Sequence, residues 1–274
     1  MPLQISDRVR ALGAQAQDAL SEQFARIDAI AEYNTQKVLS AFQTHKVAES
    51  MFQGTTGYGY DDLGRETLGA IYADLFGAED AMVRINFVNG THAISSALYG
   101  VLRPGDVLVS AIGAPYDTLQ GVIGITGDGN GSLKEFGITY RQVDLTPENT
   151  PDLPGIAQAV QDPAVKAVLI QRSRGYATRA SLSVARIGEI CQVIRSHNPH
   201  VYNCYGEFVE TTEPTQVGAD LIMGSLIKNP GGGLAPMGGY VAGRRDLVEC
   251  AATRMTVPGI GRECGASLRN NRAL

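Results

Sequence analysis

The stretch AMVRINFVNGTHAISSALYGVLRPGDVLVS, residues 81–110, decides the fold. Two short apolar runs within it, residues 81–85 and 107–110, have the length and composition of buried strands. Between them, apolar residues recur at three- and four-residue steps over residues 93–102, which is the spacing of one helix face. The stretch therefore predicts a strand, a helix and a second strand in succession.

The same alternation continues along the rest of the chain. Further strand-like runs and helical patterns follow at residues 138–143, 153–160, 167–170, 184–195, 220–223 and 239–242. Alternating strands and helices are typical of a mostly parallel sheet whose faces are covered by helices. We therefore expect an α/β fold.

The N-terminal part of the chain has a different pattern. Residues 1–56 predict a helical arm, in which apolar residues recur at helical spacing: Val9, Leu12, Ala16, Leu20, Phe24, Ile27 and Ile30. A glycine- and tyrosine-rich loop over residues 54–60 and a predicted helix over residues 64–76 follow the arm. We place one main domain at residues 57–274.

Composition limits the classes of function. The 274 residues carry a formal net charge of -5, which argues against nucleic acid or an anionic membrane as the partner. The four cysteines form no CxxC pair and no His/Cys cluster has ligand spacing, so we expect no metal site. No charged-then-apolar leader opens the chain, and no apolar run approaches roughly 18 residues. We expect a soluble protein of the reducing cytoplasm.

The segment NGTHAI, residues 89–94, follows a predicted strand and opens a predicted helix. Free backbone N–H groups and the helix dipole at such a position suit a phosphate group, with Gly90 and Thr91 nearest to it. A Gly-Thr pair at a helix start is more often an ordinary cap. Because no GxGxxG or GxxxxGK[ST] pattern is present, a phosphate- or nucleotide-binding α/β domain is the weakest interpretation.

A lysine occupies the segment SLIKNPGGG, residues 225–233, just beyond a predicted strand. A lone lysine usually lies on the solvated surface. Lys228, however, sits between apolar neighbours and a turn enforced by proline and three glycines, where desolvation would make its amine nucleophilic. Ser225, three residues upstream, could bind a phosphate beside it. This pattern favours a lysine that forms a Schiff base.

Two further segments carry aromatic or basic side chains near predicted helix starts. Tyr116 follows the strand at residues 107–110 and could stack on a planar cofactor ring, although a core tyrosine is about as common there. In the segment GYGYDDLGR, residues 57–65, Arg65 could bind a phosphate, whereas the two aspartates could simply cap the following helix.

Taken together, these segments resemble the methionine gamma-lyase-like family, also called aluminium resistance proteins. This family lies within the fold-type I enzymes that use pyridoxal 5'-phosphate (PLP) and is related to the cystathionine lyases. The resemblance extends to about residue 267 and rests on residues 57–65, 89–94, 171–176 (QRSRGY), 203–208 (NCYGEF) and 225–233.

The resemblance implies roles for individual residues in a carbon–sulfur lyase that acts on a small sulfur amino acid. It implies that Lys228 forms the Schiff base with PLP and moves the alpha proton, and that Gly90, Thr91 and Ser225 hold the phosphate. It implies that Tyr116 stacks on the pyridine ring. By similarity, Tyr58 and Arg65 reach the phosphate of a neighbouring subunit, with Tyr60 as a competitor, so a homodimer or homotetramer is expected.

The sequence departs from the family in two places. An aspartate that pairs with the pyridine nitrogen ends a buried strand in the family, but Tyr202 stands at that position and we expect the strand to be several residues short. Glu207 could substitute only if the backbone shifts. In the family a small C-terminal domain supplies the arginine for the substrate carboxylate, and we expect this domain to be missing here. The alternative function is therefore a PLP-binding or apo remnant with impaired catalysis.

Overall fold

A seven-stranded sheet forms the body of the protein in the computed structural model, which describes residues 4–127, 129–195, 200–204 and 206–274. The strands lie in the order β1-β7-β6-β5-β4-β2-β3. Strand β7 is antiparallel to both of its neighbours, and the other six strands run in one direction. The strands are β1 (Asp80–Arg84), β2 (Val107–Ser110), β3 (Thr139–Gln142), β4 (Val165–Gln171), β5 (His200–Cys204), β6 (Leu221–Ser225) and β7 (Gly239–Gly243).

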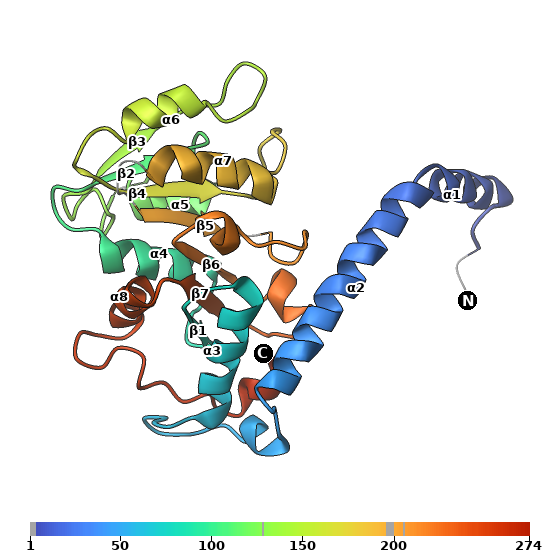
Figure 1. The fold of residues 1–274 in the computed structure, drawn as a ribbon, viewed down its shortest axis with the longest axis horizontal. Helices are drawn as coiled ribbons and strands as arrows, with labels where there is room; N and C mark the ends of the chain where they lie inside the picture. Colours follow the sequence, from blue (N-terminus) through green and yellow to red (C-terminus); the bar gives the residue numbers. More distant parts are fainter. Residues whose placement is uncertain (1–3, 128, 196–199, 205) are drawn as a thin grey trace.

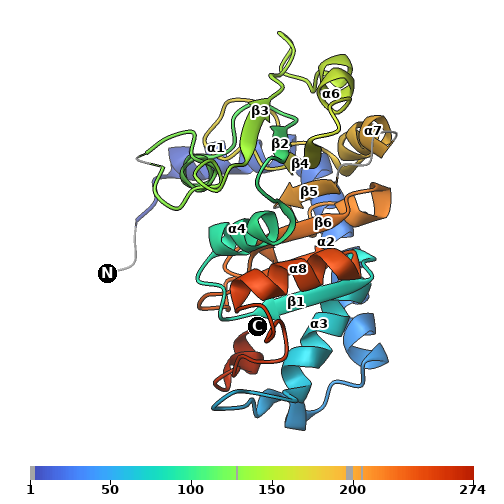
Figure 2. The ribbon, with the colours of Figure 1, turned by 90° about the vertical axis from the view of Figure 1, so that its left-hand side faces the viewer.

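Helices cover both faces of this sheet (Figures 1 and 2). The α-helices are α1 (Asp7–Ala19), α2 (Ser21–Thr44), α3 (Leu63–Phe76), α4 (Gly90–Val101), α5 (Asp117–Ile123), α6 (Leu153–Ala159), α7 (Val184–Arg195) and α8 (Arg245–Met255). Four short 3-10 helices complete the set: η1 (Glu49–Phe52), η2 (Pro214–Val217), η3 (Asn229–Gly231) and η4 (Asn270–Ala273). The predicted α/β fold with a mostly parallel sheet is confirmed.

Two apolar cores lie on opposite faces of the sheet, because successive strand side chains point to opposite sides. In β2, for example, Val107 and Val109 pack with side chains of α3, α6 and α7. Leu108, between them, packs with side chains of α4, α5 and α8. Helix α5 and helix α8 were not among the predicted elements.

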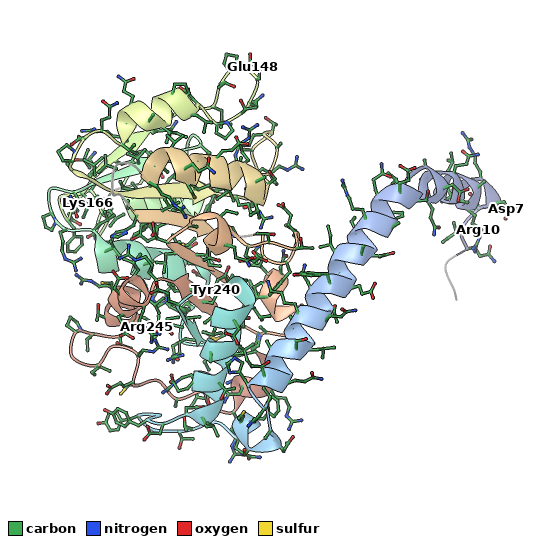
Figure 3. The ribbon with its side chains drawn as sticks, in the orientation of Figure 1. Asp7, Arg10, Glu148, Lys166, Tyr240 and Arg245 are labelled. Carbon is green, nitrogen blue, oxygen red and sulfur yellow. The ribbon has the colours of Figure 1, made fainter. Side chains whose placement is uncertain are left out.

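The N-terminal helices α1 and α2 extend away from the body (Figure 1), and Asp7 and Arg10 lie at their far end (Figure 3). Within the described residues, the second half of α2 packs on the body. Val38 and Ala41 contact α3, and Asn34 Nδ2 donates to the carbonyls of Phe208 and Glu210 at 3.0 and 3.1 Å. The apolar residues of the predicted arm are instead largely exposed: Val9 56%, Leu12 56%, Leu20 44%, Phe24 44% and Ile27 55%. The helices are as predicted, but their apolar stripe faces away from the core of this subunit.

Strand β5 lies in the middle of the sheet. It has five residues, as many as β6 and β7, and all five pair with consecutive residues of β4. The expectation that this strand is shorter than its counterpart in the family stays a prediction, but its five residues are enough to pair fully with β4. The strand is central, and hydrogen bonds with both neighbours hold it in register.

Candidate functional site

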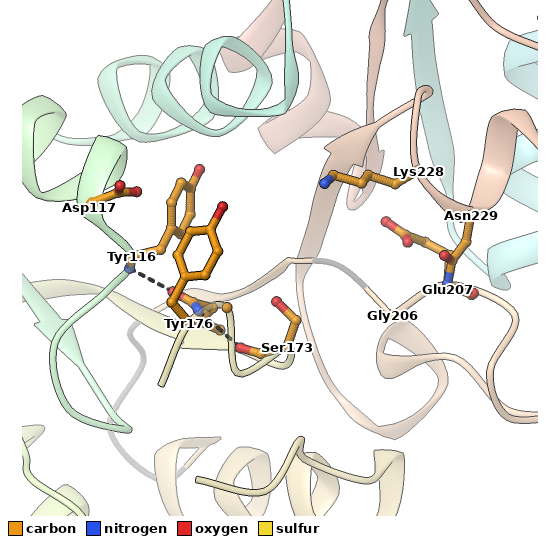
Figure 4. Close-up of a pocket in the computed structure, with 10 residues that line it drawn as sticks. Tyr116, Asp117, Ser173, Tyr176, Gly206, Glu207, Lys228 and Asn229 are labelled. Atoms are coloured by element: carbon orange, nitrogen blue, oxygen red, sulfur yellow. Dashed lines mark hydrogen bonds between the residues drawn. The ribbon is translucent and has the colours of Figure 1, made fainter. Parts of the chain in front are cut away.

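A pocket of about 510 Å³ opens where β4, β5 and β6 end, at the edge of the sheet to which parallel strands direct their carboxyl ends (Figure 4). Loops that follow these strands and β2 supply its walls. The lining residues are Tyr116, Asp117, Gln171, Ser173, Gly175, Tyr176, Gly206, Glu207, Lys228 and Asn229. Two of the predicted site residues, Tyr116 and Lys228, thus lie in one cavity.

Lys228 reaches the pocket because of the turn that follows β6. The backbone N–H of Lys228 donates to the carbonyl of Ser225 at 3.2 Å, and the 3-10 helix η3 begins at the next residue. A Cβ on Gly231 would lie 1.8 Å from the carbonyl oxygen of Leu226, so only glycine permits this close return of the chain. The side chain of Lys228 then points into the cavity (Figure 4).

Tyr116 lies on the opposite wall and is fixed at both ends. Its backbone N–H donates to Gln171 Oε1 at 2.9 Å. Its hydroxyl lies 3.0 Å from Thr91 Oγ1, which is also 3.2 Å from Thr118 Oγ1. The phenol ring is therefore held in one orientation, with its hydroxyl at the start of α4.

The first turn of α4 brings Gly90 and Thr91 to the same end of the sheet. Asn89 caps the helix by accepting a hydrogen bond from the His92 backbone N–H at 2.9 Å. The backbone N–H groups of a helix start have no partner within the helix, so this turn can bind an anion. The predicted helix starts at residue 93, three residues inside the observed helix, and the cap at Asn89 explains the difference.

Ser225 is the last residue of β6 and is 2% exposed. Within the described residues, its hydroxyl oxygen has no hydrogen-bond partner. A buried hydroxyl without a partner carries a desolvation cost of about 1–3 kcal/mol. It is therefore a site where a bound polar group would gain a hydrogen bond.

Glu207 and Tyr240 form a buried pair at the wall of the pocket, which the sequence did not predict. Glu207 Oε1 accepts a hydrogen bond from the hydroxyl of Tyr240, and the other carboxylate oxygen, Oε2, has no partner among the described residues. Burial raises the pKa of the Glu207 carboxyl, although the hydrogen bond from Tyr240 opposes the shift. No sequence signal pointed to Tyr240, because it lies on β7, 33 residues further along the chain.

Tyr202 lies under the pocket rather than in its wall. Its side chain is fully buried in the core between the sheet, α4 and α8, and it is not among the lining residues. Within the described part of the chain its hydroxyl has no hydrogen-bond partner. Burial raises the pKa of Tyr202 well above its usual value, so the phenol stays neutral.

Tyr58 and Arg65 lie outside this pocket. Tyr58 is 76% exposed and stacks on Tyr60 with ring centroids 5.9 Å apart. The guanidinium of Arg65 is buried and donates to the carbonyls of Gly59, Gly265 and Glu263 at 2.6, 2.8 and 3.2 Å. Within one subunit Arg65 therefore ties the segment near residue 265 to α3, and its role toward a second subunit stays a prediction.

Comparison with known proteins gives a family match and close relatives. Residues 9–274 match the family model described as methionine gamma-lyase. The uncharacterised protein YnbB of Bacillus subtilis is 52% identical over 248 residues, which are 89% of this chain and 59% of that protein. L-methionine gamma-lyase of Pseudomonas putida is 26% identical over 234 residues, which are 83% of this chain and 52% of that enzyme.

A solved structure is also similar along almost the whole chain. The carbon–sulfur lyase involved in aluminium resistance from Clostridium novyi superposes with a TM-score of 0.94 at 48% identity. The alignment covers 98% of this chain and 65% of that one. The chain thus spans about six-tenths of the length of its curated relative from Bacillus. None of the helices in the described ranges combines the length and apolar character required to cross a membrane.

Proposed function

The chain belongs to the methionine gamma-lyase family, and we propose that it is a PLP-dependent carbon–sulfur lyase that acts on a sulfur amino acid through Lys228. The observation that carries the proposal is the pocket itself, in which the Lys228 amine faces the fixed ring of Tyr116. Family membership implies PLP as the cofactor.

The residues around the pocket fit this cofactor. A planar ring suits the face of Tyr116, whose orientation is fixed through Gln171 and Thr91. A phosphate suits the first turn of α4 at Gly90 and Thr91, together with the partnerless hydroxyl of Ser225. The buried hydroxyl in particular is explained by a ligand that accepts its hydrogen bond.

Each residue then has a defined task in the reaction. When bound, PLP supplies an electron-withdrawing ring that stabilises the negative charge left by loss of a proton from the amino acid. Lys228 would hold the cofactor covalently until the substrate amino group takes its place on the cofactor, and the Nζ amine released in that exchange would then take the alpha proton from the substrate and return a proton later. Tyr116 keeps the ring in place, and Thr91 keeps Tyr116 in place.

The second candidate function is a PLP-binding protein with impaired turnover. It is favoured by Tyr202, whose neutral phenol stands where the family resemblance implies a carboxylate. A phenol cannot stabilise a protonated ring nitrogen as a carboxylate does. Replacing Tyr202 by Asp tests this alternative. A large gain in lyase activity would support it, and unchanged activity would contradict the assigned role of this position.

The test of the main proposal is attachment of the cofactor. The protein is incubated with PLP, reduced with borohydride and digested, and the modified peptide is identified by mass spectrometry. We expect the label on Lys228, its loss in Lys228→Ala, and its retention in Lys166→Ala, a matched change of an exposed lysine on β4 (Figure 3). A folded protein that takes up no PLP would overturn the proposal.

We also propose that the chain forms a homo-oligomer through its N-terminal arm. Leu20, Phe24 and Ile27 expose an apolar stripe on helices that leave the body. Exposed apolar residues at helical spacing of this kind mark an interaction site. A second copy would meet the exposed Tyr58, whereas Arg65 would first have to leave its three carbonyl partners. Phe24→Glu should lower the mass measured by light scattering, with Glu32→Gln on α2 as the control. An unchanged mass would contradict this interface.

A further inference from the structure

One carboxylate oxygen of Glu207, Oε2, is buried at the wall of the pocket and has no hydrogen-bond partner among the described residues. Glu207 is only 3% exposed. Its carboxyl group lies on the same side of the cavity as Lys228 (Figure 4). The lining residues include one other carboxylate, Asp117, which is exposed and accepts a hydrogen bond from the backbone of Thr118. Glu207 is therefore the buried acid of the pocket.

The protein holds this carboxyl group in a fixed position. Tyr240, itself 1% exposed and stacked on Phe76 at 5.3 Å, donates to Oε1. Asn229 Nδ2 donates to the backbone carbonyl of Glu207 at 2.8 Å, which ties Glu207 to the residue beside Lys228. A Cβ on Gly224 would lie 2.5 Å from Glu207 Oε1, so the glycine leaves the space that the carboxyl occupies.

No cation of the described chain forms an ion pair with this carboxyl group. The nearby guanidinium of Arg172 is engaged with Glu210 Oε1 at 2.6 Å, with the carbonyl of Leu182 at 3.2 Å and with the carbonyl of Gly206. Burying a carboxylate without a positive charge beside it costs free energy, and burial accordingly raises the pKa of Glu207. A positively charged ligand group that reaches Oε2 would remove this cost.

We propose that Glu207 Oε2 is a binding site for a cationic N–H donor of the ligand in the pocket. Two ligands carry such a group, because the ring nitrogen of PLP can be protonated and an amino acid has an ammonium group. The inference rests on the proposed PLP site, since the first donor belongs to that cofactor. In this proposal Glu207, in the loop after β5, supplies the carboxylate of the pocket. Strand β5 itself supplies none, because Tyr202 stands at the position concerned.

The test compares Glu207→Gln with Asp117→Asn, which removes the same charge from the exposed acid of the pocket. Glutamine keeps the shape and an oxygen that can accept the Tyr240 hydrogen bond. Equilibrium dialysis measures the affinity of PLP and of an analogue with carbon in place of the ring nitrogen. Calorimetry on the PLP-free protein measures L-methionine against its analogue without the amino group.

We expect Glu207→Gln to bind either PLP or L-methionine about tenfold more weakly than wild type, and to bind the analogue of that ligand as well as wild type does. Asp117→Asn should change the affinity for PLP and for L-methionine by less than threefold. The ligand that loses affinity identifies the donor. Equal affinities of wild type and Glu207→Gln for all four ligands would overturn the inference and leave Glu207 as a structural partner of Tyr240.

Two controls keep the outcomes separate. Failure of wild type to bind PLP would count against the proposed cofactor, while the methionine comparison would still decide the role of Glu207. If Glu207→Gln does not fold, as judged by circular dichroism, Tyr240→Phe replaces it. That variant removes the donor that positions the carboxyl group, so the inference predicts a weaker affinity for the nitrogen-bearing ligand and an unchanged affinity for its analogue. Unchanged affinities for both ligands would contradict it.

Discussion

A buried acid near the arm makes the stability of the protein depend on pH. Glu213 is 1% exposed, and its Oε1 accepts a hydrogen bond from the Phe208 backbone N–H at 2.8 Å. Burial raises the pKa of Glu213 from 4.5 to about 7, although this hydrogen bond and the charges of Arg172 and Lys37 oppose the shift. The neighbouring acid Glu207 adds to the rise.

The magnitude follows from the difference between the two pKa values. A rise from 4.5 to about 7 corresponds to about 3 kcal/mol of free energy of unfolding. Because the folded protein binds this proton more tightly than the unfolded chain, the contribution of Glu213 to stability is highest below about pH 4.5 and is lost as the pH rises through about 7. Above that pH, the loss from this group is complete.

Glu213→Gln removes the titration and keeps an oxygen for the Phe208 N–H. We expect the free energy of unfolding of the variant not to fall between pH 4.5 and about 7 as it does in wild type. The variant should be more stable than wild type by up to about 3 kcal/mol at pH 9 and about equally stable at pH 4. Urea unfolding followed by circular dichroism at several pH values measures this. The control is Glu148→Gln, at the tip of an exposed loop (Figure 3). A constant difference between Glu213→Gln and wild type from pH 4 to pH 9 would refute the reasoning.

Three other changes test the cap of α3 and the residues of the pocket. Burial raises the pKa of Asp62, but hydrogen bonds from Ser267, Thr55 and the Arg65 backbone outweigh it and lower the pKa to about 2. Asp62→Asn should therefore lower the free energy of unfolding by about 2 kcal/mol in urea at pH 7. This loss should vanish as the pH falls through about 2. Ser225→Ala removes a hydroxyl that has no partner in the described chain, so stability should hold or rise while PLP affinity in dialysis falls about tenfold. Gly231→Ala should abolish labelling of the 228 peptide by PLP and borohydride, because no Cβ fits beside the main chain there.

Most of the sheet was predictable because β1, β2, β4, β6 and β7 are buried, mainly apolar runs, whereas β3 (TYRQ) is largely exposed. The predicted strands at residues 107–110 and 239–242 agree with β2 and β7 to within one residue, since buried central strands need continuous apolar sequence. Helix α5 was missed because it has only seven residues, too few for a periodic pattern. The sequence also could not predict that the apolar stripe of the arm is exposed, because the spacing of apolar residues identifies a helix face but not what that face contacts.

The site was predictable where its geometry is local. The turn after β6 contains proline and glycine, and these residues next to Lys228 predict a turn from the sequence alone. Contacts between distant segments left no such signal. Tyr116 meets Thr91 across 25 residues, and Tyr240 meets Glu207 across 33 residues, through pairings that only the assembled sheet creates.

The contrast between Tyr202 and Glu207 shows why the strand order decides the chemistry of the pocket. Tyr202 lies within β5, and the alternation of strand side chains directs it into the apolar core, where its phenol stays neutral. Glu207 lies in the loop beyond the strand, where β6 and β7 place Gly224 and Tyr240 around its carboxyl group. A charged group can therefore reach the pocket from the loop without crossing the core. If the ligand carries a cationic nitrogen, this loop is the part of the described chain that places a buried carboxylate within its reach.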